Sequence, residues 1–251
     1  MAKQKPWYET LFTDLRPFFA QITQKGTNEQ VRYTIKLLGL KKGMTFLDCP
    51  CGIGRISIPL ALRGIKVTGV DLTESYLDEF QGAIKRRKLR IPILHADMRQ
   101  IPYKNQFDAG GNLWTSFGFF EQESQNVLAI RKMYQALKPG GKFLLHVINR
   151  DWIIANYQSR GWMEMDGVIT FESRKFDYAT SINRCVWKFL KDGRLTEHHV
   201  GLRMYAYHEL IAMFRKVGFI DIQGFGDTKG GPIDRNSQMM WVVGTKPKRR
   251  R

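Results

Sequence analysis

The sequence predicts a single α/β domain over residues 1–251, in which helices cover both faces of a mostly parallel sheet. Two patterns predict this fold. Between residues 44 and 149, short apolar segments alternate with segments whose apolar residues recur every three or four positions, and such alternation is typical of a parallel sheet. After residue 149 several β-like segments follow one another directly, which indicates an antiparallel insertion before the chain returns to the sheet.

Residues 41–150 are expected to form the ligand-binding half of the domain. The segment 142–149 (KFLLHVIN) is apolar on both faces, as a buried parallel strand should be. The helix before it is expected to end at the Lys-Pro-Gly-Gly sequence of residues 138–141. We therefore expect five parallel strands at 44–48, 66–71, 93–97, 107–113 and 142–149, with helices at 55–63, 73–84 and 127–137.

Residues 1–40 are expected to form an N-terminal helical cap. The large apolar residues between positions 7 and 22 fall at three- and four-residue steps, which places them on one face of a helix. Thr27 and Gln30 resemble a capping box at the start of a second helix, and Gly39 is expected to end it.

A β-rich insertion is expected over residues 165–206, after the fifth strand. It contains three predicted antiparallel strands, and Asp192-Gly193 is a strong hairpin signal between the last two. The insertion is expected to pack over the carboxyl edge of the sheet, where with the N-terminal helix it closes a lid over a compact pocket. The predicted strands lie at 168–176, 184–190 and 194–205, followed by a helix at 207–217 that Gly218 ends and by two sheet strands at 219–225 and 238–245, which makes seven strands in the main sheet.

The composition is that of a globular protein with an unusual basic excess. Forty Lys and Arg against 23 Asp and Glu give a net charge of +17, and residues 85–90 and 246–251 carry five positive charges each. Such charge attracts anions, including nucleic acid, although a solvated helix end and a solubilising tail explain the same pattern. We expect no membrane segment, because no apolar run approaches the ~20 residues that a span needs. Three cysteines and the absence of a signal-like segment predict a cytoplasmic protein.

A glycine-bearing turn follows the first predicted strand, with the sequence DCPCGIGR at residues 48–55. Gly52 and Gly54 lack a Cβ atom, so the backbone can curl tightly and approach a ligand. Seventeen residues beyond Gly54, Asp71 ends the second strand, where a carboxylate can accept both hydroxyl groups of a ribose. In an open α/β sheet ligands bind beyond the carboxyl ends of the strands. The pattern predicts a site for an adenosine-containing ligand.

NAD is the first alternative for that ligand. Its fingerprint has a third glycine where this chain has Ser57. A pyrophosphate also favours a turn without nearby negative charge, whereas Asp48 opens this one. A carboxylate there suits the ammonium group of S-adenosylmethionine, so the residues favour that ligand over a dinucleotide. The Cys-Pro-Cys of residues 49–51 lacks the two-residue spacer of zinc motifs, and no metal is expected.

Five segments of the chain match the motifs of one protein family in the family's order: FLDCPCGIGR, VTGVDLT, HADMRQIPY, FDAGGNLWTSFG and LKPGGKFLLHV. They resemble the motifs of class I S-adenosylmethionine-dependent methyltransferases, over about residues 27–246, and in particular a bacterial and archaeal branch of small-molecule type. The resemblance implies a Rossmann-like seven-stranded sheet. It also implies S-adenosyl-L-methionine as the cofactor and S-adenosyl-L-homocysteine as the product.

The resemblance also assigns cofactor-binding residues one by one. Asp48 and the turn through Gly52, Gly54 and Arg55 would hold the methionine end, and Asp71 would hold the ribose. Leu72 and Met98 would sandwich the adenine, Asp97 would accept from its exocyclic amine, and the backbone of Asn112 and Leu113 would bind the amino-acid moiety. One position departs from the family: its first glycine is Pro50 here, which removes an N–H and fixes φ, so the turn must differ locally.

The methyl acceptor is less defined. The favoured hypothesis is transfer to an N, O or S atom of a small molecule; an RNA or protein acceptor and a cofactor-binding protein without catalysis are the alternatives. No catalytic base is assigned, since a lone histidine such as His146, His198, His199 or His208 is more often structural. The lining of the acceptor pocket is expected to include Trp7, Tyr8, Trp114, Phe117, Arg203 and Tyr205.

Overall fold

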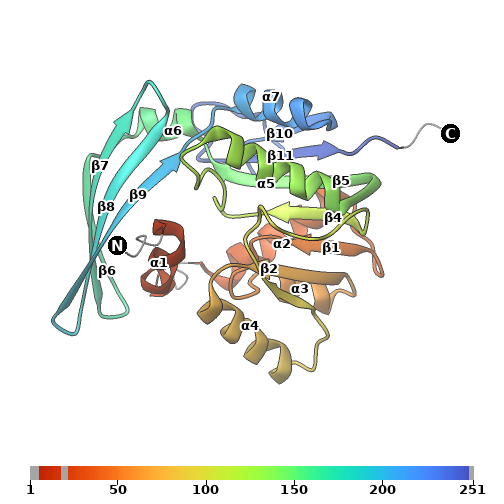
Figure 1. Ribbon diagram of the computed structural model, residues 1–251, viewed down its shortest axis with the longest axis horizontal. Helices are drawn as coiled ribbons and strands as arrows, with labels where there is room; N and C mark the ends of the chain where they lie inside the picture. The colour runs from red at the N-terminus through yellow and green to blue at the C-terminus, as the bar shows by residue number, and fades with distance from the viewer. Residues whose placement is uncertain (1–5, 18–21, 249–251) are drawn as a thin grey trace.

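A computed structural model describes residues 6–17 and 22–248 of the chain. Its centre is a seven-stranded sheet with the strand order β10-β11-β5-β4-β1-β2-β3, as predicted (Figure 1). The last strand of the chain, β11, pairs antiparallel with both of its neighbours, β5 and β10, and the other neighbouring strands of this sheet pair in parallel. The strands are β1 (Thr45–Asp48), β2 (Lys66–Asp71), β3 (Ile93–His95), β4 (Phe107–Asn112), β5 (Leu137–Ile148), β10 (Ile220–Phe225) and β11 (Met239–Thr245).

The order of the strands locates the ligand-binding edge. From β1 the chain moves outward through β2 to β3 and then returns to place β4 on the other side of β1. The strand order therefore reverses between β1 and β4, and the carboxyl ends of the strands open a crevice at such a point. The predicted glycine turn follows β1 directly, so it lies at this crevice.

Helices cover both faces of the sheet, as the alternation predicts. On one face, α2 (Gln24–Leu38), α3 (Ser57–Leu62) and α4 (Glu74–Arg86) contribute Val31, Leu60 and Phe80 to one buried apolar cluster. On the other face, α5 (Glu123–Ala136) and α7 (Tyr207–Val217) contribute Ile130 and Phe214 to a second cluster. No helix in the described part of the chain is long and apolar enough to cross a membrane.

A second sheet stands over the carboxyl edge of the first. It is antiparallel, with the order β6-β7-β8-β9, and Figure 1 shows helix α1 lying between the two sheets. Asp192 and Gly193 have φ of 48° and 73° and form the predicted hairpin turn between its last two strands. The elements are α1 (Trp7–Asp14), α6 (Arg150–Ala155), β6 (Arg160–Met165), β7 (Val168–Asp177), β8 (Ile182–Lys191) and β9 (Arg194–Arg203).

Several predicted boundaries are wrong. The second sheet has a fourth strand, β6, and spans residues 160–203. β6 is an edge strand whose exposed face combines the polar Arg160 and Glu164 with the large apolar Trp162, so its sequence shows no clear alternation of apolar and polar residues. Strand β5 begins at Leu137, so the Lys-Pro-Gly-Gly sequence lies within it. Helix α1 ends at Asp14, and residues 18–21 of the predicted helix lie outside the described residues.

The predicted capping box of the second helix is also wrong. The helix begins at Gln24, and the hydroxyl of Thr23 accepts a hydrogen bond from the N–H of Gly26. Thr27 is buried inside the helix, which starts one turn earlier than its apolar stripe. The predicted end at Gly39 is confirmed, with Gly39 in the left-handed conformation, and so is the end of α7 at Gly218.

Candidate active site

A cavity of about 450 Å³ opens at the carboxyl ends of β1, β2 and β4. One wall consists of the turn after β1, the end of β2, and residues 96–98 and 113–116. The opposite wall consists of α1 and the inner face of the second sheet. The cavity therefore lies at the crevice that the strand order defines, and the predicted packing of the insertion over this edge is confirmed.

Two buried carboxylates end β1 and β2. Asp48 is 2% exposed and accepts a hydrogen bond of 2.6 Å from the hydroxyl of Ser57. Asp71 accepts from the backbone N–H of Gly52 at 2.7 Å and of Thr73 at 2.8 Å. Burial raises the pKa of both carboxyl groups, that of Asp48 to about 7. Ser57 thus holds a carboxylate where the NAD fingerprint has a glycine.

The two glycines of the turn are required for different reasons. Gly52 lines the cavity with φ +52°, and a Cβ there would meet only the edge of the Tyr76 ring, at 3.9 Å. Gly54 has φ +81°, and a Cβ there would lie 2.1 Å from the Phe80 ring of α4. Gly52 is therefore the glycine that leaves its backbone open to a ligand, whereas Gly54 allows the turn to pack on α4. The Cys49–Pro50 peptide bond before them is cis.

Arg55 brings a partly buried cation to the same turn. Its guanidinium donates to the side-chain carbonyl of Gln30 at 2.7 Å and lies over the Trp114 ring, 5.5 Å from the centroid. Burial lowers the pKa of Arg55 to about 10, and the charge of Asp48 acts against that shift. The group remains charged at neutral pH, so this end of the cavity holds one cation beside one carboxylate.

The third predicted carboxylate has a partner that the sequence analysis missed. Asp97 lines the cavity with Leu72 and Met98, and it accepts hydrogen bonds from the side chain of Arg99, with Nε 3.0 Å from both oxygens. The Arg99 guanidinium also lies 4.0 Å from the centroid of Phe120. Only the two-residue spacing of opposite charges could have indicated this pair.

The end of β4 contributes backbone and apolar surface. Leu113 lines the cavity. Asn112 is buried behind it, with its amide N–H₂ donating to the carbonyl of Ser116 at 3.0 Å. The Oδ1 atom of Asn112 is buried without a hydrogen-bond partner. The structure thus brings Leu113 to the cavity surface and places the Asn112 side chain beneath it.

The acceptor-side residues divide into two groups. Trp7, Tyr8 and Trp114 line the cavity, as predicted. Arg203, Tyr205 and Phe117 do not line it, so the sequence analysis is wrong about their position. Alternate residues of an extended chain face opposite sides, and Val200, Leu202 and Met204 are the ones that face the cavity.

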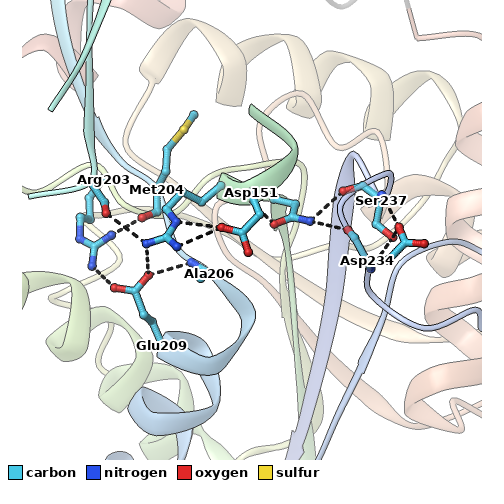
Figure 2. A network of polar contacts seen from close by, with 10 residues as sticks. Asp151, Arg203, Met204, Ala206, Glu209, Asp234 and Ser237 are labelled. Carbon is cyan, nitrogen blue, oxygen red and sulfur yellow. Dashed lines mark hydrogen bonds and ion pairs between the residues drawn. The ribbon is translucent and has the colours of Figure 1, made fainter. Parts of the chain in front are cut away.

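Arg203 belongs to a network of polar contacts that includes Glu209 and Met204 (Figure 2). The guanidinium of Arg203 hydrogen-bonds the carboxylate of Glu209 and the carbonyl of Met204. The hydroxyl of Tyr205 donates to Glu123 at 2.9 Å. These contacts join the end of β9 to the starts of α5 and α7, so they fix the second sheet relative to the first.

The histidines do not supply a base. None of the described histidines lines the cavity. His146 is 2% exposed, its Nδ1 accepts from the N–H of Trp114 at 3.3 Å, and its ring stacks on Trp241 with centroids 3.9 Å apart. Burial lowers the pKa of His146 to about 3, so the ring is neutral. His146 holds the loop after β4 in place, a structural role.

Comparison with known proteins shows what the chain is similar to. Residues 46–141 match the family described as a methyltransferase domain. The chain is 28% identical over 180 residues to "Putative methyltransferase YqeM" of Bacillus subtilis (strain 168), an alignment that covers 69% of this chain and 72% of that protein. In two further curated relatives, a putative methyltransferase of Geobacillus sp. (strain WCH70) and a ubiquinone biosynthesis O-methyltransferase of Idiomarina loihiensis, the match spans about half of the relative's own length. Residues 46–141 are therefore similar to a methyltransferase domain, and the curated relatives are described as methyltransferases.

Solved structures share the fold of this chain. An S-adenosylmethionine-dependent methyltransferase from Clostridium acetobutylicum ATCC 824 superposes with a TM-score of 0.80 at 12% identity, over 95% of this chain and 100% of the other. CalS10, an amino pentose methyltransferase from Micromonospora echinaspora solved with S-adenosylmethionine bound, gives 0.64 at 17% identity, over 97% and 99%. These alignments cover nearly the whole chain, so the similarity of fold includes both sheets.

Helix α1 is attached on both sides of the cavity. Arg16, just after α1, forms two hydrogen bonds of 2.7 Å with Glu79 of α4, and the Tyr76 hydroxyl donates to the carbonyl of Phe12. On the other side, Asp14 accepts from Thr196 at 3.0 Å and lies 2.8 Å from Nε2 of His198 on β9. These contacts join residues more than 60 positions apart, so local patterns could not have predicted them.

Replacing Gly54 tests the packing role of the turn. Gly54→Ala should lower the free energy of unfolding by about 2–5 kcal/mol, because it combines a left-handed backbone with a clash against Phe80. Gly39→Ala is the matched control: φ is +64° there but a Cβ meets open space, so a loss of about 1–2 kcal/mol is expected. Chemical denaturation measures both, and equal losses would contradict the packing role.

The raised pKa of Asp48 predicts a pH-dependent stability. The unfolded carboxyl loses its proton near pH 4 and the folded one near pH 7, so the wild type loses stability as pH rises through that window. Asp48→Asn removes this loss, and at pH 8 the variant should be more stable than the wild type by roughly 1–4 kcal/mol. Thermal or urea unfolding from pH 4 to 8 measures the difference.

Asp177→Asn is the control with the opposite sign. The hydroxyl of Thr180 and the N–H groups of residues 179 and 180 lower the pKa of that exposed carboxyl. Its contribution to stability is therefore present above pH 4 and lost in acid, so the variant should be the less stable protein at neutral pH. If the free energies of unfolding of Asp48→Asn and the wild type differ by the same amount at every pH from 4 to 8, the raised pKa of the buried Asp48 is refuted.

Proposed function

We propose that the strand-end half of the cavity binds S-adenosylmethionine through the residues that the sequence analysis assigned. The ammonium group of the methionine moiety would pair with Asp48, and the carboxylate of the same moiety would pair with Arg55. The ribose hydroxyls would donate to Asp71, which ends the neighbouring strand. The adenine would lie between Leu72 and Met98, with Asp97 near its exocyclic amine and the backbone of Asn112–Leu113 near the methionine end.

The residues present fit this ligand chemically. Asp48 is a buried carboxylate whose hydrogen-bond donor is a neutral hydroxyl, so a bound ammonium would stabilise its charge. Gly52 leaves its backbone open where a Cβ would enter the cavity. A pyrophosphate would instead approach two buried carboxylates, which costs free energy. The chemistry of the turn therefore supports the sulfonium nucleoside over a dinucleotide.

We infer that the acceptor is a small molecule. The observation that supports this most is the opposite wall: α1 and the second sheet stand over the carboxyl edge and line, with the strand ends, a cavity of about 450 Å³. CalS10, with the same arrangement of sheets, is named for an amino pentose acceptor. When bound, S-adenosylmethionine supplies a methyl group whose bond to sulfur breaks as an acceptor N, O or S lone pair attacks the carbon. The protein contributes alignment and exclusion of water.

The described parts of the two basic segments, residues 85–90 and 246–248, lie away from this cavity. Residues 85–90 comprise the last two residues of α4 and part of the loop before β3, so they lie at the amino edge of the parallel strands. Lys246 follows β11, which is antiparallel, and its Nζ donates to the carbonyl of Leu137 at the start of β5, at the same edge (Figure 1). Residues 249–251 of the basic tail lie outside the described residues. This placement favours a small acceptor over RNA, which remains the second candidate because of the net charge of +17.

Replacing Asp71 tests the cofactor site. Asp71→Ala removes the acceptor for the ribose hydroxyls, and we expect S-adenosylmethionine affinity to fall by about 30- to 1,000-fold, equivalent to about 2–4 kcal/mol of charged hydrogen bonding. Isothermal titration calorimetry measures the change. Asp177→Ala, an exposed turn carboxylate on the second sheet, is the matched control and should bind as the wild type does. Wild-type affinity in Asp71→Ala would overturn the assignment.

The acceptor class is tested by following a labelled methyl group. The protein is incubated with methyl-labelled S-adenosylmethionine and a cell extract, and label is measured in the small-molecule, RNA and protein fractions. We expect the label in the small-molecule fraction. Label in RNA or protein would favour the second candidates, and cofactor binding without any transfer would indicate a non-catalytic protein.

A further inference from the structure

The two halves of the cavity differ sharply in charge. The three carboxylates that line it lie along the strand-end wall, at the ends of β1 and β2 and just after β3. On the opposite wall the second sheet contributes Trp187, Val200, Leu202 and Met204, and α1 contributes mainly aromatic and aliphatic side chains. None of the described lining residues on that wall carries a charge.

The nearest charged side chains outside the carboxylate wall already have partners. Arg99 is paired with Asp97, and Arg203 is paired with Glu209 behind the cavity. Arg55 lies beside Asp48 at the cofactor end. An acceptor that carried a phosphate or carboxylate into the apolar half would therefore be desolvated without a counter-charge, at a cost of several kcal/mol.

Four hydroxyl groups of the cavity lining, of which Tyr8 lies on the α1 wall, already have a hydrogen-bond partner. Tyr8 accepts from Arg99 at 3.3 Å, and Tyr76 donates to the carbonyl of Phe12. Thr115 accepts from the N–H of Ile148 at 3.1 Å, and Ser116 donates to the carbonyl of Leu113 at 3.0 Å. The O–H groups of Tyr8 and Thr115 remain able to donate, so recognition in this half combines apolar contact and shape with a few hydrogen bonds rather than a dense set.

Aromatic rings supply much of that contact. Trp7 packs edge-on against Phe119 with centroids 5.1 Å apart, and Phe12 lies 5.6 Å from the same ring. Such rings bury a large apolar area and present faces and edges that favour another ring. The wall is thus suited to a flat, uncharged molecule.

We propose that the methyl acceptor is an uncharged, mainly apolar small molecule that contains an aromatic ring. This inference rests on the proposed function, because it assigns the apolar half of the cavity to the acceptor. It also names the residues that select the acceptor: Leu202 and Val200 of β9 and Trp187 of β8 face it from the second sheet, and Trp7 and Phe12 face it from α1.

Two fluorescent probes that share one skeleton test this directly. N-phenyl-1-naphthylamine is uncharged, and 8-anilinonaphthalene-1-sulfonate adds a sulfonate to the same rings. In protein saturated with S-adenosylhomocysteine, the uncharged probe should bind at least about tenfold more tightly, because the sulfonate finds no counter-charge. Equal affinities, or tighter binding of the sulfonate, would overturn the proposal. This comparison uses the wild-type chain, so it does not depend on whether any variant folds.

A pair of variants locates the probe. Leu202→Arg places a cation in the apolar wall, so it should weaken the uncharged probe at least about tenfold and strengthen the sulfonate. Trp162→Lys is the matched control: Trp162 is 71% exposed on β6 and lines a different hollow, so both probes should bind as they do to the wild type. Loss of probe binding in the control but not in Leu202→Arg would contradict the proposal.

Titration of S-adenosylhomocysteine separates this proposal from the one on which it rests. Leu202→Arg should bind it within about twofold of the wild type, because the substitution lies on the wall opposite the carboxylates. If the wild type binds no S-adenosylhomocysteine, the cofactor assignment fails. If it binds the nucleoside but does not prefer the uncharged probe, only the acceptor class is refuted.

Discussion

The site depends on one hydrogen bond, from the backbone N–H of Gly52 to the carboxylate of Asp71. It joins the turn after β1 to the end of β2, two strands that already pair in parallel with Asp48 opposite Gly69. Asp71 is buried and its pKa is raised, and the N–H groups of Thr73 and Gly52 offset part of the cost of that burial. With the turn held in this way, Gly52 presents backbone rather than side chain to the cavity.

One wall of the cavity carries carboxylates and the other is apolar, because each wall is supplied by a different sheet. Parallel strands deliver carboxylates and a glycine turn to one edge, since every strand that ends there points the same way. The antiparallel sheet presents every second side chain to the cavity and can be apolar on that face without disturbing the core of the first sheet. Helix α1 completes the enclosure through contacts to α4 and β9, although the individual surface ion pairs contribute little free energy.

Much of the first sheet could be predicted from the sequence, because each buried parallel strand and each amphipathic helix carries its own local pattern. The positions of Asp48, Gly52 and Asp71 followed from that pattern, since residues at successive strand ends must meet. The second sheet was harder to predict. Edge strand β6 and the short helix α6 have weak periodicity, and placing Arg203 and Tyr205 in the cavity was wrong because a shift of one residue along a strand exchanges its two faces. The pairs Asp97–Arg99 and Asp14–His198 depend on side-chain geometry that the sequence does not show.

A crystal structure of the protein grown with S-adenosylhomocysteine would test the cofactor site most directly. The expected result is density for the nucleoside at the ends of β1 and β2, with both ribose hydroxyls within hydrogen-bond distance of Asp71, the amino group near Asp48, and the space beside Leu202 left for the acceptor. Density on the other side of the cavity, against the second sheet, or a ribose without contact to Asp71 would contradict the arrangement proposed for this site.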